Sequence, residues 1–110
     1  MKLLKTLSII LFHGIASLMI LHAQNYEAKV TKIINEDGDS PSATFAILED
    51  ELGFIWFGTV DGLYRYDGYN FKTFRYNKED SNSLSNNTIR DLAYTDNSIW
   101  MATSGGGINC

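Results

Sequence analysis

Few residues of this 110-residue chain are of types that could do chemistry. Its two histidines, His13 and His22, both lie within the first 23 residues. From residue 24 onward the sequence therefore cannot carry a Ser-His-Asp triad, a histidine metal cluster or a phospho-accepting histidine. The single cysteine, Cys110, has no partner for an internal disulfide. We expect no catalytic residue, no cofactor and no metal site in this stretch.

Two clusters resemble ion or phosphate sites but lack the required spacing. The acidic series Asp37-Gly38-Asp39 and the later Asp50 could suggest a calcium loop, yet the regular ligand series of such loops is missing. We interpret these residues as turn formers. The run 105–107 is three glycines, but neither a Lys-Ser or Lys-Thr pair nor a helical pattern follows it, so it does not form a phosphate loop.

Aromatic residues could bind sugar rings. Trp56 and Trp100 could stack on a sugar, but both lie inside apolar runs at matching places, so we predict that both pack in the core. Tyr64, Tyr66 and Tyr69 lie near turns and could line a carbohydrate cleft. We favour tyrosines that fill sheet interfaces with the hydroxyl at the edge. The sequence thus leaves the ligand-binding residues unknown.

The elements that would position these residues repeat along the chain. Residues 54–59, FIWFGT, return as residues 98–103, SIWMAT, so Trp56 and Trp100 are 44 positions apart (100 − 56). A period of about 40 to 50 residues with a strand-borne tryptophan and trailing glycines indicates a β-propeller blade. We predict an all-β fold with one complete four-stranded blade and part of a second.

A propeller ring closes with about 4 to 8 blades, so we expect a truncated propeller, the first part of a longer design. Exposed blade faces and unpaired edges lead us to predict that residues 24–110 do not fold stably alone.

The chain divides into four parts. Residues 1–23 have a positive start, an apolar run and the small residue Ala23 before a cut, which is typical of a secretory signal peptide. Residues 24–41 are expected to form a lead-in strand, over 26–34, and a loop. Residues 42–80 form the first blade, and residues 81–110 form an incomplete second blade.

Turn formers separate strand-like runs within the first blade. The expected strands fall within 45–48, 54–59, 63–66 and 69–76, and a polar connection over 77–87 leads to the next blade near Thr88. Small residues at the matching positions Gly58 and Ala102 predict the close approach of a neighbouring backbone. Asn70, Lys72 and Arg75 interrupt the last strand, as expected for a solvated outer edge.

The charge excludes one class of partner. The full chain has a net charge of −4, and from residue 24 onward seven basic and thirteen acidic residues give −6. An acidic chain without a basic patch binds nucleic acid poorly, because phosphate contacts supply most of that affinity. We expect no nucleic-acid partner.

Residues 48–68, LEDELGFIWFGTVDGLYRYDG, resemble the two-component regulator propeller repeat of Bacteroidetes hybrid sensors. The segment 84–90 resembles their inter-blade connection, and 105–109 also fits the repeat, while 94–97 departs from the acidic turn of the first copy. The resemblance implies a periplasmic, homodimeric sensor that a later segment anchors in the inner membrane. Such sensors bind oligosaccharides and signal through a histidine kinase and a phosphorelay. The signal raises transcription of polysaccharide-utilisation genes.

From this resemblance we expect the chain to be the N-terminal part of a periplasmic sensor propeller, without catalytic activity of its own. The kinase, and with it the enzymatic activity, would lie outside the sequence. Two alternatives stay open: a fragment of a secreted propeller enzyme similar to streptogramin lyases, or a propeller that acts only as an interaction scaffold.

Overall fold

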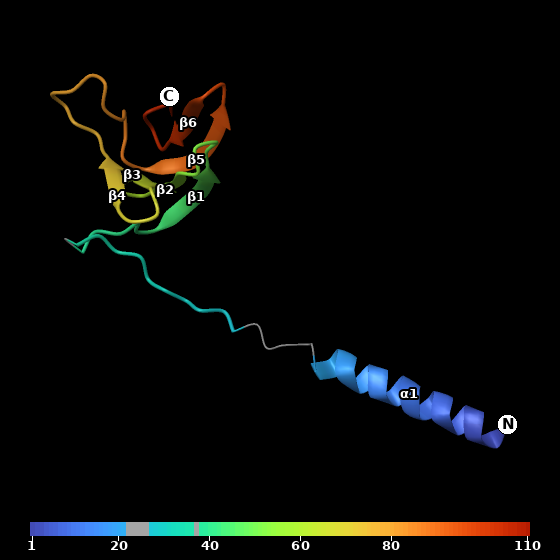
Figure 1. Ribbon diagram of the computed structural model, residues 1–110. Coiled ribbons are helices and arrows are strands. Elements are labelled where there is room, and N and C mark those ends of the chain that lie inside the picture. The colour runs from blue at the N-terminus through green and yellow to red at the C-terminus, as the bar shows by residue number, and fades with distance from the viewer. Residues whose placement is uncertain (22–26, 37) are drawn as a thin grey trace. The chain divides into compact units, whose positions relative to one another are not determined.

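A computed structural model describes residues 1–21, 27–36 and 38–110. The chain divides into two compact units, Met1–Thr31 and Lys32–Cys110, which are seen as a helix with its following segment and a strand-rich body (Figure 1). The second unit contains both predicted repeats.

The first unit contains the helix α1 (Lys2–Leu21). Leucine-rich sequence without proline favours a helix, and the Thr6 hydroxyl donates to the Lys2 carbonyl oxygen at 2.9 Å. Among residues 1–21, 27–36 and 38–110, no helix is long and apolar enough to cross a membrane. The signal-peptide interpretation stays a prediction, and its cleavage point after Ala23 lies outside the described residues.

Four antiparallel strands in chain order form the first sheet. They are β1 (Thr44–Glu49), β2 (Ile55–Thr59), β3 (Gly62–Tyr66) and β4 (Phe71–Phe74). The glycine of each Asp-Gly turn, Gly62 and Gly68, adopts a positive φ, which glycine tolerates without steric cost. The four strands of the first repeat therefore form as the turn pattern predicts.

The strands of the second sheet pair in the same register as the equivalent strands of the first sheet. Its strands β5 (Ile89–Thr95), β6 (Ser98–Thr103) and β7 (Ile108–Asn109) are again antiparallel neighbours in chain order. In both sheets the first hairpin contains a bulge, between Thr44 and Ala46 and between Ile89 and Asp91. The all-β prediction is confirmed for the second unit, and the sequence repeat is also a repeat of strand pairing.

The first hairpin turn differs between the sheets. Asp96 and Asn97 alone join β5 to β6, and both have positive φ, 51° and 60°. This combination matches the type I′ hairpin turn, whose twist suits antiparallel strands. The departure that the sequence shows over 94–97 is thus a shorter turn within the same hairpin.

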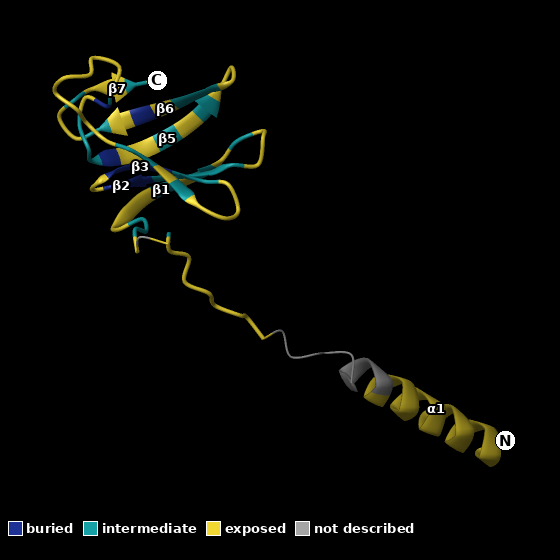
Figure 2. Cartoon of the chain, turned by 60° about the vertical axis from the view of Figure 1, so that its left-hand side comes forward, coloured by how far each residue is buried: buried dark blue, intermediate teal, exposed yellow. Residues whose placement is uncertain are grey.

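The core lies between the two sheets, where β5 packs against β1 and β2 (Figure 2). Its buried residues are Leu63, Leu84, Ile89 and Met101, and Trp56, Phe74, Leu92 and Ile99 pack against them. A Cβ atom added to Gly58 would lie 2.7 Å from Cγ2 of Ile89. The small residue at position 58 is therefore required by a close neighbour, which is a side chain rather than the backbone that we predicted.

The predicted lead-in strand over 26–34 is wrong for the residues that the structure describes, since 27–36 form no strand. Val30 is 93% exposed, and no described strand pairs with this segment to satisfy its backbone groups. The turn that follows does form: the Gly38 amide donates to the Asn35 carbonyl oxygen at 2.9 Å, and the Asn35 amide donates to that of Asp39 at 2.8 Å.

Candidate ligand cleft between the two sheets

A cleft of about 720 Å³ opens between the two sheets of the second unit. Its floor is apolar and comes from both sheets: Trp56, Leu63, Phe74, Ile99 and Met101. Its rim is polar and includes Asn77, Asp80, Asn82, Ser83, Asn97 and Asn109. The cleft therefore combines aromatic rings with amide groups that can both donate and accept hydrogen bonds.

Trp56 on β2 is the largest aromatic group of the floor, and two contacts fix its ring. The indole stacks on Phe74 with ring centroids 5.9 Å apart and an angle of 26°. Its Nε1–H donates to Oδ2 of Asp50 at 2.8 Å. Trp56 is half-buried against the core, as its apolar run predicts, and it also lines the cleft.

Asp50 holds the turn beside this tryptophan. Its Oδ1 accepts hydrogen bonds from the amides of Leu52 at 2.9 Å and Phe54 at 3.0 Å. Burial disfavours the ionised carboxylate, but the hydrogen bonds from the Trp56 indole and the two amides outweigh it and lower the pKa of Asp50. The turn-forming role predicted for Asp50 is confirmed.

The other acidic cluster also has a structural role. Asp37 lies outside the described residues, while Gly38 has a φ of 83° and Asp39 binds neighbouring hydroxyl groups. Among residues 1–21, 27–36 and 38–110, no group of three or more His, Cys, Asp and Glu side chains could hold a metal ion.

The sequence analysis did not single out Arg65, which lies beside Trp56. Arg65 pairs with Trp56 in the register of β3 and β2, so both side chains are on the same face. Its guanidinium carbon lies 4.4 Å from the Phe54 ring centroid and 5.7 Å from that of Trp56. Its buried Nε has no hydrogen-bond partner in the described part of the chain. Arg65 was missed because a contact between a cation and an aromatic ring has no recognisable motif in a single sequence.

Side chains of the connection 77–83 hold its part of the cleft rim in place. The Asn77 amide donates to Oγ of Ser83 at 2.8 Å, and the Asn82 amide donates to Oδ1 of Asp80 at 2.9 Å. The Ser83 hydroxyl lies within 2.9 Å of the Asn77 carbonyl oxygen and within 2.8 Å of that of Asp80. The polar connection is thus a compact loop.

The opposite side of the rim is the turn between β5 and β6. The Tyr94 hydroxyl donates to Oδ1 of Asn97 at 2.9 Å, which orients that amide. Burial and the nearby carboxylates of Glu51 and Asp50 raise the pKa of Tyr94. The turn between β5 and β6 therefore contributes Asn97 and Ser98 to the lining of the cleft.

The other face of the first sheet contains a polar network around Tyr64. This side chain is buried, and its hydroxyl accepts from Arg75 at 2.7 Å and donates to Oδ1 of Asp39 at 3.3 Å. Arg75 also pairs with Asp61, at 3.0 Å. Burial raises the pKa of Tyr64, against the opposing charge of Arg75. Tyr64 is therefore buried, but on the face that points away from the second sheet, so it does not fill the sheet interface that we predicted, and it does not line the cleft.

The predictions for the remaining aromatic residues are not all confirmed. Tyr66 is half-buried and its hydroxyl donates to the Gly68 carbonyl oxygen at 2.7 Å, whereas Tyr69 is an exposed turn residue and fills no interface. The prediction that Trp100 is a core residue is wrong: it is 43% exposed. Its strand position matches that of Trp56, but its face of the second sheet points away from the first sheet, and no described residue covers it.

The glycines of 105–107 form the turn between β6 and β7. The first sheet contains an equivalent turn between β2 and β3. The Thr103 hydroxyl donates to the Gly107 carbonyl oxygen at 2.8 Å, and the Thr59 hydroxyl donates to that of Gly62 at 2.8 Å. The second turn is longer than the first by one residue, as the insertion in the repeat requires.

Comparisons with known proteins agree with this repeat. Residues 37–61, which include β1 and β2, match the family model of the two component regulator propeller. The chain is 40% identical over 85 residues to histidine kinase P4 of Formosa agariphila. That alignment covers 77% of this chain but only 6% of the relative, so the chain corresponds to a small part of that protein.

These findings confirm two predictions. Residues 37–61 form a two component regulator propeller repeat, and the four-stranded and three-stranded sheets are arranged as propeller blades. The resemblance to the propeller region of two-component sensor kinases is also confirmed.

Proposed function

We propose that this chain is part of the ligand-input propeller of a two-component system. The match of residues 37–61 to a regulator propeller, together with the similarity to a relative named a histidine kinase, supports this function. Ligand binding would bias the conformation of the propeller and so the activity of a kinase. No histidine follows His22, so the phospho-accepting residue would belong to another segment or another chain.

The ligand that best suits the cleft is an oligosaccharide. Sugars bind to aromatic ring faces through their apolar C–H surfaces, and their hydroxyl groups pair with amides and carboxylates. The cleft offers the ring pair Trp56 and Phe74 below a rim of asparagines and Asp80. Its volume of about 720 Å³ is within the usual range for small-molecule sites, about 300 to 1,000 Å³.

The same proposal includes export to the periplasm. The positively charged start and apolar α1 would direct export, with cleavage after Ala23 and with homodimerisation and membrane anchoring in a longer protein. Sequencing the N-terminus of the exported protein tests this step. A start at Gln24 agrees with it, and retention of Met1 on a cytoplasmic protein contradicts it.

Fluorescence titration tests the cleft directly. The variant Trp100→Phe leaves Trp56 as the only tryptophan, so its emission reports on the cleft floor. We expect saturable changes with at least one of a panel of neutral and uronate-containing oligosaccharides. Asn82→Ala should weaken that binding about fivefold, because a rim hydrogen bond contributes roughly 1 kcal/mol. Tyr69→Ser, in an exposed turn outside the cleft, is the matched control.

Two results would count against the proposal. If no oligosaccharide of the panel changes the Trp56 emission, the cleft is not a sugar site. If binding occurs but Asn82→Ala and Tyr69→Ser bind equally well, the sugar site lies elsewhere on the chain.

A further inference from the structure

The connection between β4 and β5, the orange loop of Figure 1, carries part of the cleft rim and then passes between the two sheets. We call residues 77–83 the rim loop and residues 84–88, LSNNT, the bridging segment. Leu84 begins the bridging segment and is only 8% exposed. It packs in the core with Leu63 of the first sheet and with Ile89 and Met101 of the second. The rim loop is therefore joined directly to a side chain that lies between the sheets.

The last two residues of the bridging segment are hydrogen-bonded to the first sheet. The Asn87 carbonyl oxygen accepts from the Gly62 amide at 2.7 Å, and its Oδ1 accepts from the Tyr76 amide at 2.6 Å. The Thr88 hydroxyl donates to the Val60 carbonyl oxygen at 3.3 Å. Val60 and Gly62 lie at the turn between β2 and β3, so the bridging segment is held to a turn of the first sheet.

The bridging segment is also hydrogen-bonded to the equivalent turn of the second sheet, between β6 and β7. The Thr88 carbonyl oxygen accepts from the Ser104 amide at 2.9 Å. The Ser85 hydroxyl donates to the Gly106 carbonyl oxygen at 2.7 Å. A Cβ atom added to Gly106 would lie 2.5 Å from Oγ of Ser85 and 2.9 Å from Cβ of Asn86. The bridging segment therefore fits closely against this turn.

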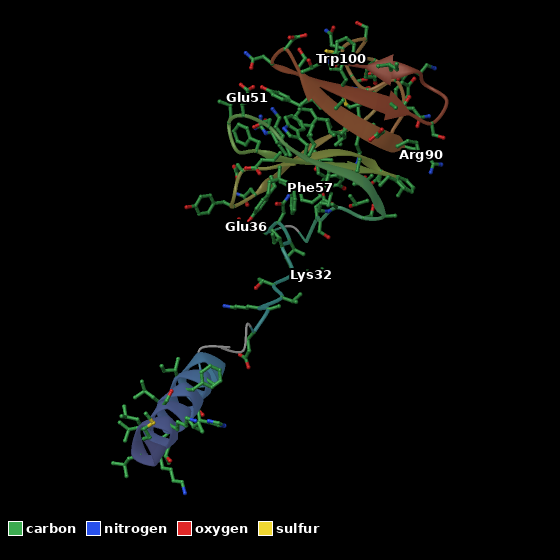
Figure 3. The ribbon with its side chains drawn as sticks, turned by 90° about the vertical axis from the view of Figure 1, so that its right-hand side faces the viewer. Lys32, Glu36, Glu51, Phe57, Arg90 and Trp100 are labelled. Atoms are coloured by element: carbon green, nitrogen blue, oxygen red, sulfur yellow. The ribbon has the colours of Figure 1, made fainter. Side chains whose placement is uncertain are left out.

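Equivalent turns of both sheets thus bind one short segment of the chain, and Figure 3 shows these sheets stacked, with Phe57 and Trp100 on opposite sides. From these contacts we infer that the bridging segment couples the rim loop to the packing of the two sheets. A displacement of the rim loop moves Leu84 and both turns, and so changes the contact between the sheets. A molecule bound at the rim would then alter the arrangement of the blades. That consequence rests on the function proposed above, whereas the coupling itself does not.

The contacts of this connection differ from those of a passive linker. A passive linker runs over the surface, leaves its polar groups to water and carries no core residue. Here Leu84 is buried, and Asn87 and Thr88 accept backbone hydrogen bonds from both sheets. The rim loop is also compact, because Ser83, which precedes Leu84, is hydrogen-bonded to Asn77 at the start of the loop. A movement of the rim loop is therefore passed to Leu84 rather than absorbed within the loop.

Hydrogen exchange at individual amides of the full chain, followed by NMR, tests the coupling. Ser83→Ala removes the hydroxyl that binds the amide and the carbonyl oxygen of Asn77, so it loosens the rim loop. The Asn77 amide should exchange about fivefold faster, as expected for one lost hydrogen bond. The amides of Gly62 and Ser104 bind the bridging segment and not Ser83, yet they should exchange about two- to fivefold faster as well. Ser81→Ala is the matched control, because the Ser81 side chain is exposed in the same loop and is hydrogen-bonded to no other described residue.

The reverse perturbation gives a second test. Gly106→Ala would push Ser85 away from the second sheet, so the Asn77 amide in the rim loop should exchange faster, because coupling between two sites is reciprocal. Circular dichroism of each variant verifies that the strands still form.

Four results would overturn the inference. Faster exchange at Asn77 alone in Ser83→Ala would mean that the rim loop moves independently of the sheets. Equal effects of Ser81→Ala and Ser83→Ala would mean that the hydrogen bonds of the loop are not the cause. Faster exchange at every amide would mean a general loss of stability, and unchanged exchange at Asn77 in Gly106→Ala would show that the coupling is absent. Because no ligand is used, none of these results decides whether the cleft binds a sugar.

Discussion

Trp56 and Trp100 occupy the same register position in two consecutive sheets, yet only Trp56 is covered by a neighbouring sheet. Trp56 stacks on Phe74 and donates to Asp50, while Trp100 is exposed on the far side of the second sheet. The position of a tryptophan in the repeat therefore does not by itself decide its burial; the presence of a neighbouring sheet does.

The first prediction compares these two residues. Trp56→Ala should lower the free energy of unfolding by about 2 to 4 kcal/mol, because it removes packing and a hydrogen bond. Trp100→Ala should change it by less than about 0.5 kcal/mol, because Trp100 is exposed. Urea denaturation of both variants measures the difference, and a cooperative transition in this chain would also overturn the expectation that residues 24–110 do not fold stably alone. Equal losses would contradict the asymmetry between the two sheets.

The second prediction concerns the close contact between the sheets. Gly58→Ala should cost about 1 to 3 kcal/mol, because its Cβ would meet Cγ2 of Ile89 at 2.7 Å. Ile89→Ala removes that atom, so the double variant should lose about 1 kcal/mol less than the sum of the single variants. A double-mutant cycle by urea denaturation measures this coupling. Strict additivity would show that positions 58 and 89 do not meet.

Much of this fold follows from the sequence because the repeat is local. Asp-Gly turns between apolar runs specify the strands, and the 44-residue spacing places Trp56 and Trp100 in equivalent hairpins. The burial of Trp100 could not be predicted in the same way, because it depends on a neighbouring sheet. The expected strand over 26–34 failed for the same reason, since a strand requires a partner as well as an alternating pattern.

The cleft was harder to predict from the sequence than the strands were. Its rim residues come from the connection 77–83 and from a turn of the next sheet, and only the packing of the sheets brings them together. Trp56 was weighed as a sugar-stacking residue and as a core residue, and the structure gives it a place in both environments. Arg65 was missed, since its contacts are with ring faces.

The third prediction is a dependence of stability on pH through Asp50. Its folded-state pKa lies below the ordinary value of 3.8, so the ionised carboxylate adds stability above that pH. This contribution is lost as the pH falls through the lowered pKa. Asp50→Asn should therefore be less stable than wild type near pH 7, and the difference should shrink in acid. Urea denaturation at a series of pH values measures it.

Glu51→Gln is the matched control for that series, because it removes a carboxylate from the same turn and leaves the three hydrogen bonds to Asp50 in place. A difference between wild type and Asp50→Asn that stays constant from neutral to acid pH would be inconsistent with the proposed role of the carboxylate.

The fourth prediction concerns the loop 35–39. Tyr64→Phe removes the hydroxyl that joins Arg75 to Asp39, at a cost of about 1 kcal/mol. The Gly38 amide, which donates to Asn35, should then exchange its hydrogen faster. Tyr66→Phe is the control, because among the described residues its hydroxyl donates to the nearby Gly68 carbonyl oxygen and takes no part in the network around Asp39. Unchanged exchange at Gly38 in Tyr64→Phe would show that the network does not hold the loop.

The most direct test of the whole account asks whether the two sheets pack as consecutive blades, since the cleft and the coupling through residues 84–88 depend on this packing. Methyl NOE spectroscopy on the isotope-labelled chain measures it. The structure predicts cross-peaks that join Leu63 in the first sheet to the methyl groups of Ile89 or Met101 in the second. NOEs confined to each sheet, with none between them, would contradict the account.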